Sequence, residues 1–305
     1  MKGFIFDNLI KYNLKDILLE NRRYISEKYC HYSKNIFIDI EINQAVRLYP
    51  NLIILGAQKS GTTSLHFYLD QHPDIFMSKP LKEPGFFRSP EQNIKYYSKR
   101  NISIKNRDYL LSNFMLQGYL GEKYIGDSST FYTNKNINKN SEIGVSIKSF
   151  TKTPKLIYII RNPFHRVVSN YLHSIERGYI KCTFNDWILG RGKQNIYTSM
   201  YFFQLNRYLL LFPREYFHIV YYDNLIGSAE EELQKIEAFL ELDVFKNYMI
   251  KRYNKTSVTM SKEEKGKLWD CDKLGHLRKL IVEDLYKFEK ILDLKVPEHF
   301  FNHSY

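Results

Sequence analysis

Two segments of the chain hold residues that could bind phosphate. The first follows an apolar run at residues 52–55 and reads Gly56-Ala57-Gln58-Lys59-Ser60-Gly61-Thr62-Thr63-Ser64. Glycines permit a tight turn, and the backbone N–H groups at a helix N-terminus bind anions. Lys59 adds a positive charge, and the hydroxyls that follow it can donate hydrogen bonds to the same anion. The segment predicts an anion-binding loop, with an ordinary strand-to-helix connection as the less favoured alternative.

The position of the lysine separates this loop from the common ATP-binding loop. In that loop the lysine directly follows the second glycine. Here Lys59 stands two residues before Gly61, and Thr62 occupies the usual lysine position. This order argues against a conventional ATPase or kinase, and a P-loop nucleotide kinase is kept as an alternative.

The second segment follows the apolar run 156–160 and begins with Arg161. Asn162-Pro163 is typical of a helix start, with the asparagine as the cap and the proline as first helical residue. Arg161 then stands at the carboxyl edge of a sheet, where ligands bind in open α/β folds. Arg166 and Ser169 share one helix face, and guanidinium with hydroxyl suits a dianionic phosphate.

Both segments resemble motifs of the sulfotransferases that use 3′-phosphoadenosine 5′-phosphosulfate (PAPS). The run GAQKSGTTSL resembles their 5′-phosphosulfate-binding loop, and R-N-P-x-x-R-x-x-S-x-Y resembles their 3′-phosphate motif. The resemblance covers residues 51 to about 260. It implies that the donor is bound by the following residues: Gln58, Lys59, Ser60, Gly61, Thr62, Thr63, Ser64, Arg161 and Ser169. Lys255 lies where the family has a basic loop over the nucleotide, with a solvated turn equally favoured. His165 is interpreted as a solvated helix residue.

A third segment, residues 79–87, contains K-E-P-x-F-F. It resembles the segment with the catalytic glutamate in the glycan sulfotransferases, the Golgi heparan-modifying branch and its bacterial relatives. The resemblance implies that Glu83 is the general base, whereas a surface loop is the plain alternative. The family's usual residue before the two phenylalanines is histidine, and Gly85 replaces it here, which points to a different acceptor. Asp127 takes the place of a family glutamate, and an orienting role and a structural role weigh equally.

Apolar runs and helical patterns alternate along the chain, which predicts an α/β, P-loop-like three-layer fold. A central parallel sheet of about five strands would carry helices on both faces. The expected strands are residues 52–55, 75–77, 124–126, 156–160 and 217–222. The expected helices are residues 62–70, 142–150, 164–176, 200–212, 229–240, 262–268 and 273–292. The polar run 133–140 is predicted to be a mobile loop. Residues 1–47 are predicted to be a helical extension, with 36–46 helix-like or extended, before a sulfotransferase domain at 48–305.

Composition limits the function classes. The chain has 305 residues, 44% of them hydrophobic and 26% charged, which excludes wholesale disorder and a coiled coil. The net charge of +12 predicts an anionic partner. A basic nucleic-acid-binding protein is a further alternative, but the sequence holds none of the recognised motifs. No apolar run reaches about 18 residues. With no secretory leader recognised, a cytoplasmic enzyme is expected if Met1 is the true start.

The sequence as a whole predicts a sulfotransferase that moves a sulfuryl group from PAPS to a hydroxyl or amine. The acceptor would be a carbohydrate, a glycoconjugate or a small hydroxylated molecule. Lys59 would stabilise the leaving phosphate while Glu83 removes the acceptor proton. No metal site is expected, since no metal-ligand cluster is apparent. We predict that Cys30, Cys182 and Cys271 are free thiols, with a disulfide bridge between Cys182 and Cys271 as the alternative.

Overall fold

The computed structural model describes residues 37–41, 44–134, 137–251, 253, 257–258 and 260–305. The described part opens with an antiparallel pair of strands, β1 (Phe37–Glu41) and β2 (Gln44–Arg47). The helical expectation for residues 1–47 is therefore wrong for these two strands, and the extended alternative for 36–46 agrees with them. Residues 1–36 lie outside the described residues, so the expectation for them stays a prediction.

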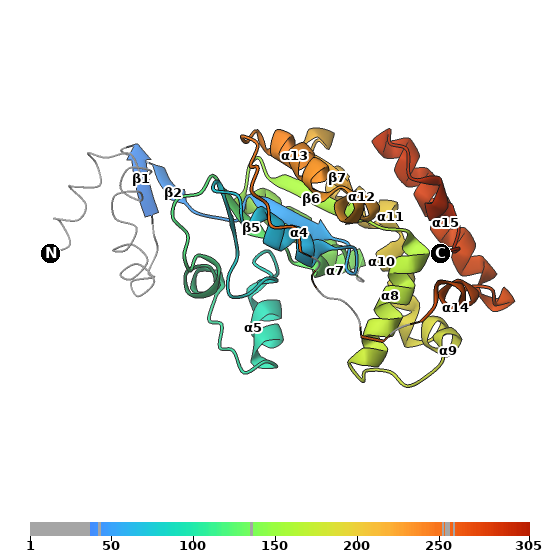
Figure 1. Cartoon of the computed structure of the whole chain (residues 1–305). Helices are drawn as coiled ribbons and strands as arrows, with labels where there is room; N and C mark the ends of the chain where they lie inside the picture. The colour runs from blue at the N-terminus through green and yellow to red at the C-terminus, as the bar shows by residue number, and fades with distance from the viewer. Residues whose placement is uncertain (1–36, 42–43, 135–136, 252, 254–256, 259) are drawn as a thin grey trace.

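A five-stranded parallel sheet forms the centre of the molecule (Figure 1). Its strand order is β4-β5-β3-β6-β7. The strands are β3 (Leu52–Gly56), β4 (Ile75–Met77), β5 (Tyr124–Asp127), β6 (Lys155–Ile160) and β7 (Phe217–Tyr221). All five predicted strands are confirmed, because buried apolar runs between helices are the pattern that a parallel sheet requires.

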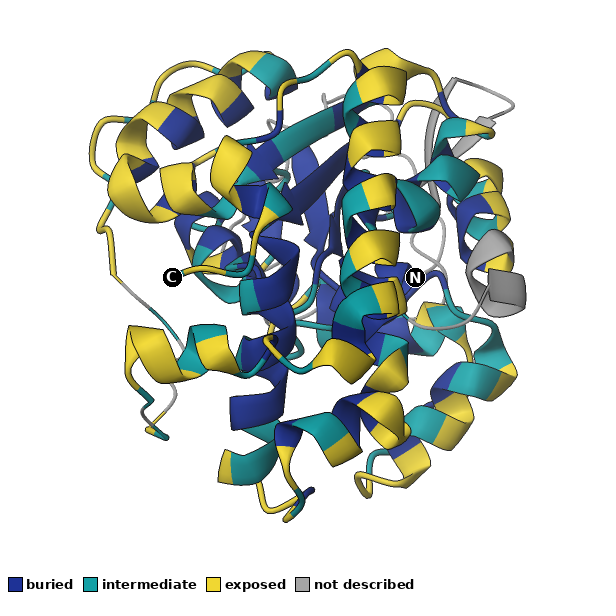
Figure 2. Ribbon diagram, turned by 90° about the vertical axis from the view of Figure 1, so that its right-hand side faces the viewer, coloured by how far each residue is buried: buried dark blue, intermediate teal, exposed yellow. Residues whose placement is uncertain are grey.

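Side chains of the strands alternate between two apolar layers. Leu52 and Ile54 of β3 pack on one layer, with helices α4 (Thr62–Leu69), α12 (Tyr222–Gly227) and α13 (Ala229–Leu240). Ile53 and Leu55 face the other, with α7 (Ile137–Phe150), α11 (Tyr201–Leu209) and α15 (Gly275–Leu292). Figure 2 shows the buried strands between helices whose outer faces are exposed. The predicted three-layer α/β fold is confirmed.

A third apolar cluster lies beside the sheet, around Trp269 and Phe164. It joins α8 (Pro163–Glu176), α9 (Phe184–Leu189), α10 (Gln194–Ser199) and the region after α14 (Lys262–Lys267). Cys182 and Cys271 both pack against this cluster as free thiols, so the possible bridge between them is not formed.

Several elements were not predicted. They are α5 (Pro90–Ser98), α6 (Arg107–Leu110), the π-helical turn Leu111–Met115, α9, α10 and α12, and the 3₁₀ turns Thr130–Thr133, Arg191–Lys193, Arg214–Tyr216, Asp272–Leu274 and Glu298–Phe301. The loop expected at 133–140 is wrong from Ile137 onward, where α7 begins. Buried Ile143 and Ile147, four residues apart, anchor this helix to the core. The polar composition of the preceding run gives no sign of that anchor.

Candidate active site

A cavity of about 910 Å³ lies beyond the carboxyl ends of the strands. Every strand of the sheet is followed by a residue that lines it: Lys59 after β3, Glu83 after β4, Thr130 after β5, Arg161 after β6 and Tyr222 after β7. Parallel strands present all their carboxyl ends at one edge, so this is where the fold gathers side chains from distant parts of the sequence.

The first predicted segment wraps one side of the cavity. Gly61 caps α4 with a left-handed φ of 90°, and Lys59 also has a positive φ of 68°. A Cβ on Gly61 would lie 3.0 Å from Cδ2 of Tyr222, so the close approach of the two segments favours glycine. The cavity is lined by Gln58, Lys59, Gly61, Thr62, Thr63 and Ser64. Ser60 is fully buried and is not among the lining residues.

Arg161 and Ser169 of the second segment line the same cavity. The Nη1 of Arg161 donates to the carbonyl of Lys59 at 3.1 Å, and its guanidinium carbon lies 4.4 Å from the ring centre of Tyr222. Burial, followed by the positive charge of Arg161, lowers the pKa of the Lys59 ammonium. The structure thus brings the two predicted anion-binding segments together.

Arg166 has a different place from the one its spacing suggested. It is fully buried and does not line the cavity, so the shared phosphate-binding face of Arg166 and Ser169 is wrong. Its Nε donates to Oγ of Ser199 at 2.6 Å, and its Nη1 donates to the carbonyl of Gln58 at 3.3 Å. Burial lowers the pKa of Arg166 to about 10. Its guanidinium therefore supports the backbone of the predicted anion-binding loop at Gln58.

The solvated interpretation of His165 is wrong. Its ring lines the cavity and stacks on Tyr305, with 3.6 Å between ring centres. The ring nitrogen Nε2 donates to the carbonyl of Ser304 at 2.7 Å, and burial lowers the pKa of His165 to about 4. Lys265, with Nζ 5.6 Å from the Tyr305 ring centre, lines the cavity as well. Nothing local in the sequence indicates that residues 265 and 305 meet α8.

The cavity is more basic than acidic. Four basic side chains line it, those of Lys59, Arg161, Arg177 and Lys265, against two acidic ones, those of Glu83 and Glu176. Glu176 accepts hydrogen bonds from the backbone N–H and the hydroxyl of Ser257 at 2.7 and 2.6 Å. This balance suits a polyanionic ligand. Lys255, the remaining donor-binding candidate, lies outside the described residues and stays a prediction.

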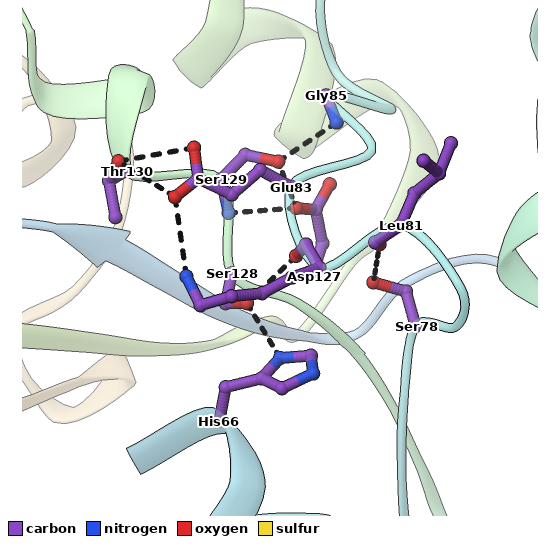
Figure 3. Close-up of polar contacts among 10 residues, drawn as sticks. His66, Ser78, Leu81, Glu83, Gly85, Asp127, Ser128, Ser129 and Thr130 are labelled. Carbon is purple, nitrogen blue, oxygen red and sulfur yellow. Dashed lines mark hydrogen bonds and ion pairs between the residues drawn. The ribbon is translucent and has the colours of Figure 1, made fainter. Parts of the chain in front are cut away.

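Glu83 also lines the cavity. Figure 3 shows its carboxylate beside the hydroxyl of Thr130. Its Oε1 accepts from Nζ of Lys82 at 3.2 Å and from Oγ1 of Thr130 at 3.2 Å. The hydroxyl of Thr130 also lies 3.3 Å from Oε2. The carboxylate is therefore held by a cation and by a hydroxyl, and it lines the same cavity as the predicted anion-binding loop.

Asp127 is fully buried and does not line the cavity. It accepts from the N–H of Phe86 at 3.2 Å, from the hydroxyl of Tyr132 at 2.5 Å, and from Ser129 through both its N–H and its hydroxyl. Burial raises the pKa of Asp127 to about 6. These contacts tie the segment after Glu83 to the end of β5, which favours the structural interpretation of Asp127.

The local fold explains why glycine stands before the two phenylalanines. Gly85 has a φ of 69°, and its N–H donates to Oγ of Ser129 at 2.8 Å. A Cβ at this position would lie 2.8 Å from Cζ of Phe131 and 3.2 Å from Oδ1 of Asn93. A histidine does not fit here unless Phe131 moves. If the reaction needs the role that histidine has at this position, another residue of this chain must supply it.

Comparison with known proteins identifies the family. The model of the sulfotransferase domain matches residues 49–288. The chain belongs to the sulfotransferase family. Heparan sulfate glucosamine 3-O-sulfotransferase 5 of mouse (Mus musculus) is 28% identical over 217 residues, covering 67% of this chain and 56% of the relative. The human bifunctional heparan sulfate N-deacetylase/N-sulfotransferase 2 is 25% identical over 212 residues, which are 65% of this chain and 23% of the relative.

This sulfotransferase-family chain spans about half the length, or less, of these curated relatives. A solved sulfotransferase from Alicyclobacillus acidocaldarius superposes with a TM-score of 0.64 over 82% of this chain and 98% of that one. Its sequence identity of 22% makes this a likeness of fold. Within the described ranges, no helix has the length and apolar character that a membrane crossing needs. The cytoplasmic location stays a prediction.

Proposed function

We propose that this protein transfers a sulfuryl group from PAPS to a hydroxyl or amine of a carbohydrate acceptor. One observation carries the proposal. The anion-binding loop with Lys59, the pair Arg161 and Ser169, and the carboxylate of Glu83 line a single cavity, although they come from three strands. Family membership supports the reaction class. An ATP-dependent kinase has no comparable support, because Thr62 stands where the kinase loop needs its lysine.

The donor side of the cavity matches the charge of PAPS. The N-terminus of α4 and its hydroxyls would bind the 5′-phosphosulfate, and Arg161 with Ser169 would bind the 3′-phosphate. As the sulfur–oxygen bond to the 5′-phosphate breaks, its electron pair stays on the phosphate oxygen. Lys59 and the loop N–H groups would stabilise that developing charge.

The acceptor side supplies the base. The acceptor oxygen or nitrogen attacks sulfur in line with the leaving phosphate, and its proton passes to the carboxylate of Glu83. The products are the sulfated acceptor and 3′,5′-adenosine bisphosphate. The sulfuryl group carries less negative charge than a phosphoryl group, so the transfer needs no metal clamp. The described residues contain no group of three or more His, Cys, Asp or Glu side chains able to hold a metal ion.

The acceptor class rests on the relatives. The name of the first assigns 3-O-sulfation of heparan sulfate glucosamine, and the name of the second assigns N-sulfation of heparan sulfate. A carbohydrate hydroxyl or amine is therefore the class proposed for this chain. Gly85, two residues after Glu83, stands where the family motif has histidine, so the acceptor itself is left open within that class.

Calorimetric titration with 3′,5′-adenosine bisphosphate in EDTA tests the donor class directly. We expect tight binding without metal, weaker binding of ATP, and a loss of about 10- to 100-fold in affinity in Arg161→Ala, because a charged hydrogen bond to phosphate is lost. Arg177→Ala, which removes another basic side chain from the cavity wall, is the matched control for general charge. Absence of binding, or a preference for Mg·ATP, would overturn the proposal.

A further inference from the structure

A buried histidine contacts the segment that bears Glu83. His66 lies on α4, one turn beyond the residues that line the donor side, and is 2% exposed. Its Nδ1 is 2.7 Å from Oγ of Ser128, and that oxygen is 2.9 Å from the carbonyl oxygen of Lys82 (Figure 3). This carbonyl belongs to the peptide group that joins Lys82 to Glu83.

The three groups admit one arrangement of protons. A carbonyl oxygen only accepts, so the single hydroxyl proton of Ser128 is donated to Lys82. The hydroxyl oxygen must then accept from His66, which places a proton on Nδ1. Burial, followed by the charges of Lys82 and Lys79, lowers the pKa of His66 to about 3, so the ring is neutral at ordinary pH. A neutral ring with Nδ1–H has no proton on Nε2.

We propose that His66 and Ser128 are positioning residues for Glu83. They fix the peptide group from which Glu83 projects, while Thr130 holds the carboxylate itself. Because His66 belongs to α4, whose first turn faces the donor, the chain of hydrogen bonds sets the distance between donor site and base. The inference rests on the proposed function in that it takes Glu83 as the base.

His72 supplies an internal control. It is also buried, at 3% exposed, and lies six residues further along the chain. Its Nδ1 accepts from the N–H of Asp74 at 3.1 Å, so its proton is on Nε2, which donates to the carbonyl of Asp243 at 3.0 Å. The two histidines thus carry a proton on opposite ring nitrogens, and the two hydrogen-bond partners of the His72 ring, Asp74 and Asp243, lie outside the segment that bears Glu83.

Ring ¹⁵N spectra of the full chain at pH 7 test the proton arrangement. His66→Asn and His72→Asn assign the two rings among the nine histidines. We expect the proton of His66 on Nδ1 and that of His72 on Nε2. In Ser128→Ala the His66 ring should lose this fixed tautomer. A His66 ring protonated on Nε2 in the wild-type protein would overturn the inference.

Turnover tests the positioning role. The amide nitrogen of asparagine lies as many bonds from Cα as Nδ1 does, whereas that of glutamine lies one bond further. With PAPS as donor and heparan sulfate as acceptor, we expect kcat of His66→Asn within about threefold of wild type and that of His66→Gln reduced at least about tenfold. The KM for PAPS should change less than twofold in both, and His72→Gln should retain wild-type kcat. Equal losses in His66→Asn and His66→Gln would overturn the positioning role.

Failure of the proposed function would look different. If the wild-type protein does not sulfate heparan sulfate, the proposed reaction is wrong for this acceptor. If the protein also fails to bind 3′,5′-adenosine bisphosphate, the proposed reaction is wrong altogether. The ¹³C chemical shift of the Glu83 carboxyl carbon at pH 7, assigned with Glu83→Gln, then replaces kcat as the report on the position of the carboxylate. We expect this chemical shift to be unchanged in His66→Asn and altered in His66→Gln. An unchanged chemical shift in both variants would reject the positioning role.

Discussion

The two sides of the cavity are built in different ways. On the donor side, residues 58–64 and Arg161 with Ser169 belong to two short segments, each a loop that runs into a helix. On the base side, Glu83 follows an edge strand and lies in a segment with no helix or strand of its own. That segment is held by side chains from elsewhere: Tyr97 donates to the carbonyl of Pro84 at 2.7 Å, and Asn93 donates to that of Gly85 at 2.8 Å.

The difference follows from what each side must do. Binding a polyanion needs N–H groups, hydroxyls and positive charge, which each of the two donor-side segments supplies from a loop and the start of a helix. A base must stand within hydrogen-bond reach of one proton, and a small displacement costs much of the rate. A loop alone does not hold a side chain that closely, so the base side depends on partners distant in sequence. Substitutions confined to one side of the cavity test this division.

Removing the carboxylate of the base is expected to have the largest effect. Glu83→Ala should lower kcat about 10²- to 10⁴-fold, the usual contribution of a general base, while the affinity for 3′,5′-adenosine bisphosphate changes less than about twofold. Initial rates and calorimetric titration measure the two quantities. Glu83→Gln keeps the side-chain size and should be equally slow. Retained turnover in either variant would remove Glu83 from the role of base.

Removing the loop ammonium is expected to act on the other side of the cavity. Lys59→Met keeps most of the side-chain length and should lower kcat about 10²- to 10³-fold, because the charge on the leaving phosphate loses a partner. Rates with PAPS at saturating acceptor measure this. Thr63→Ala, which removes a hydroxyl from the same cavity wall, should have a smaller effect. If Lys59→Met changes only the KM for PAPS, Lys59 binds the donor without stabilising the transition state.

Adding a methyl group to the base side tests how closely it is packed. Gly85 and Gly178 both have a φ of 69°, but a Cβ on Gly178 meets nothing within 4 Å, whereas one on Gly85 meets Phe131. Both alanine variants should be destabilised by about 1–2 kcal/mol for the left-handed backbone. Gly85→Ala should be destabilised by about a further 1–3 kcal/mol for overpacking, and it alone should be slower. Denaturant unfolding measures the difference, and equal values would contradict the close packing.

The smallest effect is expected from Asp127, a buried residue on the base side. Its ionisation should make the free energy of unfolding depend on pH. Burial raises its pKa from 3.8 to about 6 in the folded protein, so the native state holds the proton more tightly. Its contribution is therefore full below about pH 3.8 and is lost as the pH rises through 6, by at most about 1.4 kcal/mol per pH unit. Denaturant unfolding from pH 4 to 7 should show this slope in the wild type and a weaker one in Asp127→Asn. Parallel curves would show that Asp127 does not titrate in this window.

Much of the fold could be predicted from the sequence. The buried strands are apolar runs of three to six residues, and their alternation with helical patterns predicts a parallel sheet. The helix start at Asn162 also followed its local chemistry, since its Oδ1 accepts from the N–H groups of Phe164 and His165 at 3.0 and 3.1 Å. The start of α5 had the same kind of signal: Ser89 accepts from the N–H of Gln92 at 3.3 Å, and Pro90 follows it.

The sequence by itself determined the sheet, the turn of the loop that we predict to bind an anion and the start of the helix after Arg161, because hydrophobic period, glycine and capping chemistry act over a few neighbours. Only the tertiary structure decided which way each side chain faces. Arg166 turned inward to the carbonyl of Gln58, and His165 turned to Tyr305, 140 residues away. The tertiary structure also decided the position of Glu83, since Ser128 donates a hydrogen bond to the carbonyl of the peptide group between Lys82 and Glu83. Such contacts form because the ends of strands that are far apart in the sequence lie side by side in the sheet. The spacing of residues along the chain does not show which strand ends become neighbours.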